Sequence, residues 1–271
     1  MSLFSPSVGK RAVERAWLVY TPIWGGVTGL VMLGGFAERW GDGALMTFGV
    51  ALALGTIAAA FAGVRRHAEP ADRRAHARAA LSMTSGVVVL AFGLNYFQTP
   101  YFFEVLHMRY GFAATWTIDR NPVFLYLVTI PYFATYSVLA CVVLRAARRA
   151  PKALRLPLYA LAPLALAFLE TVLNANPFMT RLFCYDDLPL MLWFGTLSYG
   201  VSFVFALPVW LVSDEDPKRR WPLGATVGLM LLVVAADTLV LHGLRTFVAP
   251  AVTTVVEDAT GGRAPGGCLE P

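Results

Sequence analysis

Charged residues are scarce in this sequence, and the few present are unevenly placed. Only 14% of the 271 residues are charged, whereas 57% are hydrophobic. Soluble domains carry about 25% charged residues, and a soluble protein of this length needs a polar surface that this chain does not supply. The polar residues lie in short groups between long apolar runs. The composition therefore excludes an ordinary soluble domain and indicates a membrane protein.

Cysteine is also rare. The three cysteines, Cys141, Cys184 and Cys268, form no CxxC motif and no Cys/His ligand spacing, so we expect neither a metal site nor a disulfide framework. A single disulfide between Cys184 and Cys268 is the less favoured alternative. Cys141 lies in an apolar run and is expected to pack as a small hydrophobic residue.

The signatures of common soluble enzymes are missing too. The sequence has no P-loop, no GxGxxG after a strand, no HExxH and no GxSxG, which are the motifs of nucleotide-binding, metalloprotease and hydrolase sites. It also has no internal repeat and no separate soluble domain.

Long apolar runs dominate what is there. A membrane crossing needs about 20 apolar residues, and such runs lie at residues 16–36, 44–64, 79–98, 121–144, 156–174, 188–213 and 222–247. Because lipid cannot satisfy an open strand edge, we expect every span to be helical. The predicted fold class is an all-α polytopic transmembrane helix bundle of about seven spans.

Basic residues mark one side of this bundle. With seven spans, the side of the N-terminus holds most of the 22 Lys and Arg residues, among them Lys10, Arg65, Arg66, Arg73, Arg74, Arg145, Arg148, Arg149 and Lys218. By the positive-inside rule the N-terminus is predicted to be cytoplasmic. Basic residues placed in loops between spans also argue against nucleic-acid binding, despite a pI near 9.3.

Residues 99–120 and the C-terminus differ from the spans. The segment 99–120 is aromatic and mixed in polarity, so we expect an interfacial helix or a re-entrant piece over the bundle. Residues 1–250 are predicted to form one transmembrane domain, and the Gly-rich residues 251–271 a flexible tail.

Two acidic residues lie inside apolar runs, where ionisable side chains are costly and usually face a cavity or another helix. Glu170 is late in the fifth run, and Asp237 is near the middle of the seventh. The non-cytoplasmic half that holds Glu170 also holds four other polar positions: Asn95, Tyr96, Asp119 and Asp187. These positions predict a pocket in that half, roofed by residues 99–120.

Each of these residues also has a structural interpretation. Glu170 can bond to Asn174 or to a neighbouring helix, and Asp237 can pair with Arg245 or His242. The remaining alternatives are helix caps at Asp186, Asp187, Asp119 and Asn121–Pro122, an interfacial belt of Tyr96, Phe97, Tyr101, Phe102 and Phe103, and a solvated loop at 214–220. A membrane bundle with an acid-lined apolar pocket fits a lipid enzyme, a lipid carrier or a proton-linked transporter.

Three blocks resemble the cycloeucalenol cycloisomerase family. The block from Asn95 to Phe103 is similar to the NYFWTHYFF-type block of that family, and Phe168–Thr171 is similar to its YLET. The third block runs from Asp187 through Gly195, Leu197, Tyr199 and Pro208 to Asp214–Glu215, and the last span with Asp237 resembles the LDLWRLF segment. The resemblance covers about residues 80–250. It departs at Gln98, Pro100 and Glu104, where the family has Trp, His and a Thr-like residue.

The resemblance implies isomerisation of a 9β,19-cyclopropyl sterol, taken from the bilayer, to a Δ8 sterol without a cofactor or metal. A neutral acid protonates the cyclopropane methylene, and a base removes a proton from the neighbouring ring carbon. A carboxyl group in lipid stays protonated because desolvation disfavours its charged form. Under this resemblance Glu170 is the expected acid, and Asp237 or Asp187 the base or a counter-charge. The expected substrate-binding residues are Asn95, Tyr96, Thr99, Tyr101, Phe102 and Trp116.

Two other functions compete with an isomerase. A non-catalytic sterol or lipid carrier would bind the same ligand and tolerate Glu170→Gln. A proton-coupled transporter is less favoured, because the sequence lacks the repeat symmetry common in transporters. The dense basic loops fit a bacterial inner membrane or an endoplasmic reticulum equally.

Overall fold

The computed structural model describes residues 3–67, 69, 72–218 and 221–252. Within these residues, seven helical segments are long and apolar enough to cross a membrane: Val8–Leu33, Asp42–His67, Arg73–Glu104, Val123–Ala147, Lys152–Asn174, Leu188–Val212 and Leu223–Val252. The predicted all-α bundle of seven spans is therefore confirmed. Almost all of the predicted tail, 251–271, lies outside the described residues.

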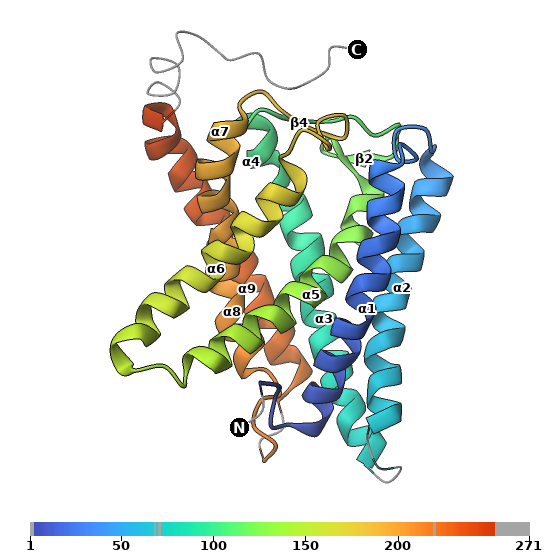
Figure 1. Ribbon diagram of the computed structural model, residues 1–271, viewed down its shortest axis with the longest axis vertical. Helices are drawn as coiled ribbons and strands as arrows, with labels where there is room; N and C mark the ends of the chain where they lie inside the picture. The colour runs from blue at the N-terminus through green and yellow to red at the C-terminus, as the bar shows by residue number, and fades with distance from the viewer. Residues whose placement is uncertain (1–2, 68, 70–71, 219–220, 253–271) are drawn as a thin grey trace.

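The helices α1 (Val8–Leu33), α2 (Asp42–His67), α3 (Arg73–Phe97) and α5 (Val123–Ala147) pack side by side, and α8 (Thr196–Val212) and α9 (Leu223–Gly243) complete the bundle (Figure 1). α5 is central, since it packs against α1, α2, α3, α6 and α8. Its sequence is apolar on most sides, which suits a helix with protein neighbours all round.

Small residues allow the closest helix contacts. A Cβ atom added at Gly63 of α2 would lie 2.7 Å from the carbonyl oxygen of Ala12 on α1. One added at Gly93 of α3 would lie 2.5 Å from the side chain of Val234 on α9. Glycine lets the backbones of α1 and α2 approach at Gly63 and lets the Val234 side chain pack against α3 at Gly93; small residues at helix interfaces are common in membrane proteins.

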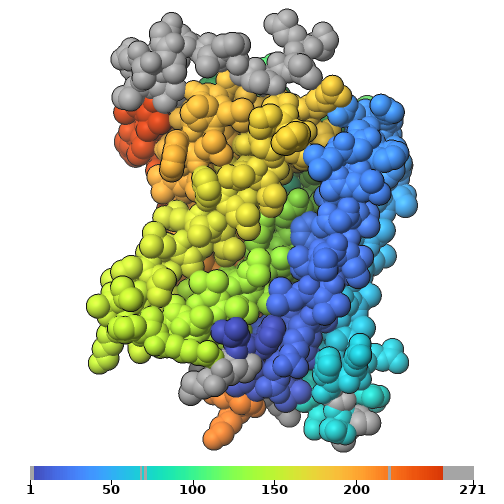
Figure 2. All heavy atoms as spheres, in the orientation of Figure 1, coloured from blue at the N-terminus to red at the C-terminus, as the bar shows by residue number. Residues whose placement is uncertain are grey.

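The helix α6 spans Lys152–Asn174. Its first half, together with the loop that joins it to α5, projects from the side of the bundle (Figure 1). Residues 152–161 are exposed apart from the half-buried Tyr159. Pro157 and Pro163 lie inside α6, where proline removes a backbone hydrogen bond and favours a bend. In Figure 2, the surface of α5 is visible between α6 and α1.

The non-cytoplasmic end of the bundle, as predicted from the charges, is covered by a roof of short elements. α4 (Thr99–Glu104) is followed by β1 (Met108–Tyr110), which pairs antiparallel with β4 (Phe183–Tyr185). β2 (Thr117–Ile118) pairs with β3 (Asn121–Pro122) across a tight turn in which Asp119 and Arg120 have positive φ. The segment 99–120 therefore lies over the bundle as expected, but as one helical turn and strands rather than an interfacial helix.

The sixth span is not uniform along its length. It begins with α7 (Leu188–Leu190), continues as the π-helix η2 (Met191–Gly195) and then becomes α8. A second π-helix, η3 (Leu244–Val248), follows α9. π-helical turns are rare and frequently occur at functional sites; η2 contributes Met191 to the cavity described below.

A buried cluster of charges joins the helices at the opposite end. Arg145 of α5 donates to Glu14 of α1 at 2.6 Å and to Glu215, after α8, at 2.7 Å. The Lys10 ammonium lies 3.2 Å from Glu215 and donates to the Ser213 carbonyl at 2.7 Å. The side chains of Lys10 and Glu14 are fully buried. The loop at 214–220 was predicted to be solvated, and for Glu215 this is wrong because its carboxylate is the counter-charge of two buried cations.

The cysteines follow the predictions in part. Cys141 is buried and free. Cys184 of β4 is disulfide-bonded, in agreement with the less favoured alternative, a single disulfide at this residue. Cys268 lies outside the described residues.

Candidate functional site

A cavity lies in the upper half of the bundle, beneath the roof. Its walls come from α1, α3, α4, α5, α6, η2 and α8, together with β1 and β4. The space that no protein atom fills is about 880 Å³ when the open mouth is included. The predicted pocket in this half of the membrane, roofed by residues 99–120, is thus present.

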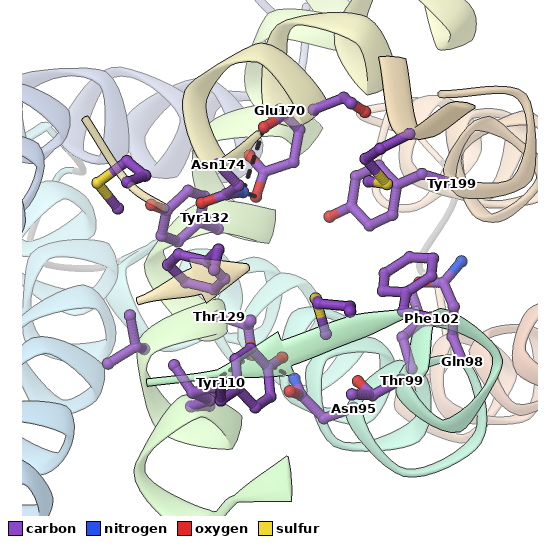
Figure 3. Close-up of a pocket in the computed structure, with 18 of the residues that line it drawn as sticks. Asn95, Gln98, Thr99, Phe102, Tyr110, Thr129, Tyr132, Glu170, Asn174 and Tyr199 are labelled. Carbon is purple, nitrogen blue, oxygen red and sulfur yellow. Dashed lines mark hydrogen bonds between the residues drawn. The ribbon is translucent and has the colours of Figure 1, made fainter. Parts of the chain in front are cut away.

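Glu170 forms one side of this cavity (Figure 3). Its Oε2 accepts a hydrogen bond from the Tyr136 hydroxyl of α5, and its Oε1 accepts one from Asn174 Nδ2 at 2.8 Å. Both partners are neutral. No Lys, Arg or His lies among the described residues that line the cavity, so nothing there supplies a cation to hold Glu170 as an anion.

The opposite side is polar but uncharged, and carries Asn95, Gln98 and Thr99 (Figure 3). Asn95 Nδ2 donates to the Ala91 carbonyl at 2.8 Å and to Thr129 Oγ1 at 2.7 Å. Both hydrogens of this amide are therefore used within the protein.

Asn121 of β3 hydrogen-bonds to this wall. Its Nδ2 lies 3.0 Å from Asn95 Oδ1, 3.0 Å from the Asn95 carbonyl and 3.3 Å from Thr99 Oγ1. The amide of Asn121 thus ties the start of α5 to the end of α3 and fixes where Asn95 and Thr99 face the cavity.

Gln98 differs from these neighbours. Its side chain is 2% exposed, it lines the cavity, and its Nε2 has no hydrogen-bond partner. It stands between α3 and α4, where the chain bends from one helix into the next.

The rest of the lining is apolar and aromatic. Four methionines (Met32, Met108, Met179, Met191) and the rings of Phe102, Phe133, Phe183, Tyr110, Tyr132, Tyr185 and Tyr199 contribute to it. Burial raises the pKa of Tyr110 and of Tyr185, both in the roof, well above the ordinary value of a phenol. These two hydroxyls are therefore neutral at physiological pH.

The structure brings four of the nine predicted site residues to the cavity: Glu170, Asn95, Thr99 and Phe102. Tyr101 is buried next to it and hydrogen-bonds to Ser198 at 3.0 Å. Tyr96 and Trp116 do not line it, since they are 51% and 57% exposed.

The two other predicted carboxylates also lie away from the cavity lining. Asp187 accepts a hydrogen bond from the Leu190 amide at 2.8 Å and caps α7, as its structural interpretation predicted. Asp237 is fully buried, and neither of its oxygens has a hydrogen-bond partner. The alternative interpretation, a pairing of Asp237 with Arg245 or His242, is wrong, because neither residue bonds to the carboxyl group and Arg245 pairs with Glu104.

Several residues of the site were not predicted: Gln98, Thr129, Tyr132, Tyr136, Asn174 as a cavity residue, and Asn121 as a hydrogen-bond donor. Tyr132 and Tyr136 are one helical turn apart on α5, and Thr129 precedes Tyr132 by three residues. A polar stripe at this spacing on an otherwise apolar span was the available signal.

Metal ligands are not gathered anywhere in the described part of the chain. No group of three or more His, Cys, Asp or Glu side chains there could hold a metal ion.

The comparisons with known proteins agree with the resemblance seen in the sequence. Over 175 residues the chain is 30% identical to the cycloeucalenol cycloisomerase of Arabidopsis thaliana. That match confirms the resemblance. The alignment covers 61% of this chain and 61% of the relative's length. No protein-family model and no solved structure matches the chain.

Proposed function

We propose that this protein is a membrane isomerase that opens the 9β,19-cyclopropane ring of a sterol taken from the bilayer and forms a Δ8 sterol. The similarity to a cycloeucalenol cycloisomerase supports the reaction class. The observation that carries the proposal is Glu170, a single carboxyl group on the wall of an otherwise uncharged and largely apolar cavity.

This environment suits a proton donor to carbon. A carboxylate without a nearby cation is costly to bury, so the neutral acid is the favoured form of Glu170. Tyr136 and Asn174 hold the two carboxyl oxygens in place from α5 and from the next turn of α6. A carboxylic acid held in this way at the edge of an apolar cavity can contact and protonate a hydrocarbon group, which water does not protonate.

The first step transfers the Glu170 proton to the cyclopropane methylene carbon. One bond of the strained ring breaks, the methylene becomes a methyl group, and positive charge develops at the ring carbon that it leaves. Aromatic faces attract cations, and Tyr132, Tyr199 and Phe102 supply such faces on the cavity wall. Glu170 is now a carboxylate, hydrogen-bonded by two donors that stabilise its charge.

The second step removes a proton from the adjacent ring carbon, and the electron pair of that bond forms the double bond. Asp187 and Asp237 were the predicted bases, but neither lines the cavity. We therefore assign this step to the Glu170 carboxylate, which takes up the ring proton and so returns to its neutral acid form. The overall reaction then consumes no proton and requires no oxidant or reductant.

The test is turnover by purified protein in membranes, with a 9β,19-cyclopropyl sterol in deuterated water and analysis by mass spectrometry. We expect a Δ8 product with one deuterium in the new methyl group, because the carboxyl proton of Glu170 exchanges with the deuterated water between turnovers. Glu170→Gln should lower the rate at least about 100-fold, as expected for loss of a general acid, while sterol binding persists. Glu104→Gln, outside the cavity lining, is the matched control and should keep most of the activity.

Sterol binding without any conversion by the unaltered protein would refute the isomerase and favour the carrier. Full turnover by Glu170→Gln would instead refute the assignment of the acid and leave the reaction standing.

A further inference from the structure

An unpartnered amide on the cavity wall points to where the ligand places its own polar group. Gln98 is almost fully buried, lines the cavity, and has a side-chain nitrogen with no hydrogen-bond partner. A buried polar group left unpaired costs about 1–3 kcal/mol, so a site that keeps one gains when a ligand pairs with it.

The neighbouring polar groups are less available. Asn95 donates both amide hydrogens, to the Ala91 carbonyl and to Thr129 Oγ1. Thr129 donates its own hydroxyl hydrogen to backbone carbonyls of α5, 3.0 Å and 3.1 Å away. Thr99 Oγ1 already accepts from Asn121. Gln98 thus has the one wholly unused amide nitrogen among the described cavity residues.

The position of Gln98 fits a ligand that spans the cavity. Gln98 lies on the side opposite Glu170 (Figure 3), one helical turn before Phe102, whose ring centroid is 6.0 Å from that of Tyr199. A polycyclic lipid held by an oxygen at Gln98 can fill the apolar space between the two walls and present its ring carbons to Glu170.

We propose that Gln98 is the residue that anchors the ligand hydroxyl, and that the site selects polycyclic lipids that carry a hydroxyl at the end remote from the reacting carbons. The hydroxyl both donates and accepts hydrogen bonds, so it satisfies the amide in either of its orientations. Gln98 was not among the predicted substrate-binding residues, which on this wall were Asn95 and Thr99. Anchoring by Gln98 rests on the proposed sterol substrate for the identity of the ligand, but not on the chemistry at Glu170.

The experiment is an equilibrium binding cycle with the full chain in lipid nanodiscs. Binding is measured in the Glu170→Gln background, so that no conversion occurs during the measurement. The ligands are a radiolabelled 3-hydroxy cyclopropyl sterol and its 3-deoxy analogue. Gln98→Met removes the amide at nearly constant volume. Thr84→Val is the matched control, since the Thr84 hydroxyl is also buried and unpartnered on α3 but lies outside the cavity lining.

Loss of one neutral hydrogen bond corresponds to about a tenfold change in Kd. We expect Gln98→Met to weaken binding of the hydroxysterol about tenfold and to leave the deoxy analogue unchanged. Thr84→Val should change neither. If Gln98→Met weakened the binding of both ligands equally, Gln98 would contribute packing alone, and the proposal would be overturned.

The comparison of the two ligands tests the proposal even if Gln98→Met fails to fold. The deoxy analogue should bind the parent protein about tenfold more weakly than the hydroxysterol, and equal affinities would overturn the proposal. A result of this kind leaves the isomerase open, because turnover by the unaltered protein is measured separately.

Discussion

Removal of Arg145 is the most informative test of what holds the bundle together. Its guanidinium makes two hydrogen bonds to Glu14, at 2.6 Å and 3.1 Å, and two to Glu215, at 2.8 Å and 2.7 Å. Arg145→Met keeps the aliphatic stem but leaves both carboxylates without this partner. Glu215 still has Lys10 at 3.2 Å, whereas Glu14 keeps the Ser5 amide at 2.9 Å as its remaining partner in the described structure.

Breaking a buried ion pair by removing one partner costs about 3–5 kcal/mol. For a chain of this size, 1 kcal/mol corresponds to about 2–4 °C in the unfolding midpoint, so we expect a decrease of about 10 °C. The assay is thermal unfolding of the protein in detergent, followed by fluorescence. Arg148→Met is the control, because Arg148 is exposed in the next turn, and it should shift the midpoint little.

A triple variant checks the reason for the loss. Glu14→Gln and Glu215→Gln, added to Arg145→Met, remove the orphaned charges and should restore part of the lost stability. An Arg145→Met protein as stable as Arg148→Met would refute the reasoning, since the cluster would then contribute nothing.

Three further predictions use the same assay. Burial tends to raise the pKa of Glu215, but the hydrogen bonds from Arg145 and the charge of Lys10 outweigh it and hold the pKa below its usual 4.5. The stability lost in Glu215→Gln should therefore be constant above pH 4.5 and shrink as the pH falls below it; a constant difference down to pH 3 would contradict this. Asp237→Val removes a buried, unpartnered carboxyl and should raise stability by about 1–2 kcal/mol with turnover retained; loss of turnover with the fold intact would return the role of base to Asp237. Gly63→Ala should lower the midpoint, because the new Cβ would lie 2.7 Å from a backbone oxygen of α1; Gly228→Ala, with nothing within 4 Å, should not, and equal effects would exclude tight packing as the cause.

The spans were predictable because hydropathy alone separates them, and all seven are where the apolar runs lie. The first helix begins at Val8 rather than at 16, since its polar first turns are buried by the ion cluster and not by lipid. Glu170 was predictable for the same reason as the spans, because an acid in an apolar run is conspicuous.

The facing of side chains was less predictable. Asn95 is buried and Tyr96 is half exposed, although both precede the same bend. When a helix is apolar on most sides, its hydrophobic pattern does not show which face points into the protein, so it cannot predict which of two adjacent residues is buried. The pairing of Glu215 with residues of α1 and α5 depends on contacts 70 and more positions apart, which a charge pattern within one loop does not reveal.

The ion cluster also bears on the order in which the chain can assemble. Lys10 and Glu14 are synthesised well before their partners, since Arg145 lies 131 positions after Glu14, and the Ser213 carbonyl 203 positions after Lys10. Until the sixth span has been made, Lys10 lacks both the Ser213 carbonyl and the Glu215 carboxylate, and of the ionic contacts in the cluster only the one between Glu14 and Arg145 can form. The α1 helix, which is made before the other described spans, is thus among the last of them to be fixed in place. A nascent chain halted after α5 holds α1 by one ionic contact of this cluster, between Glu14 and Arg145.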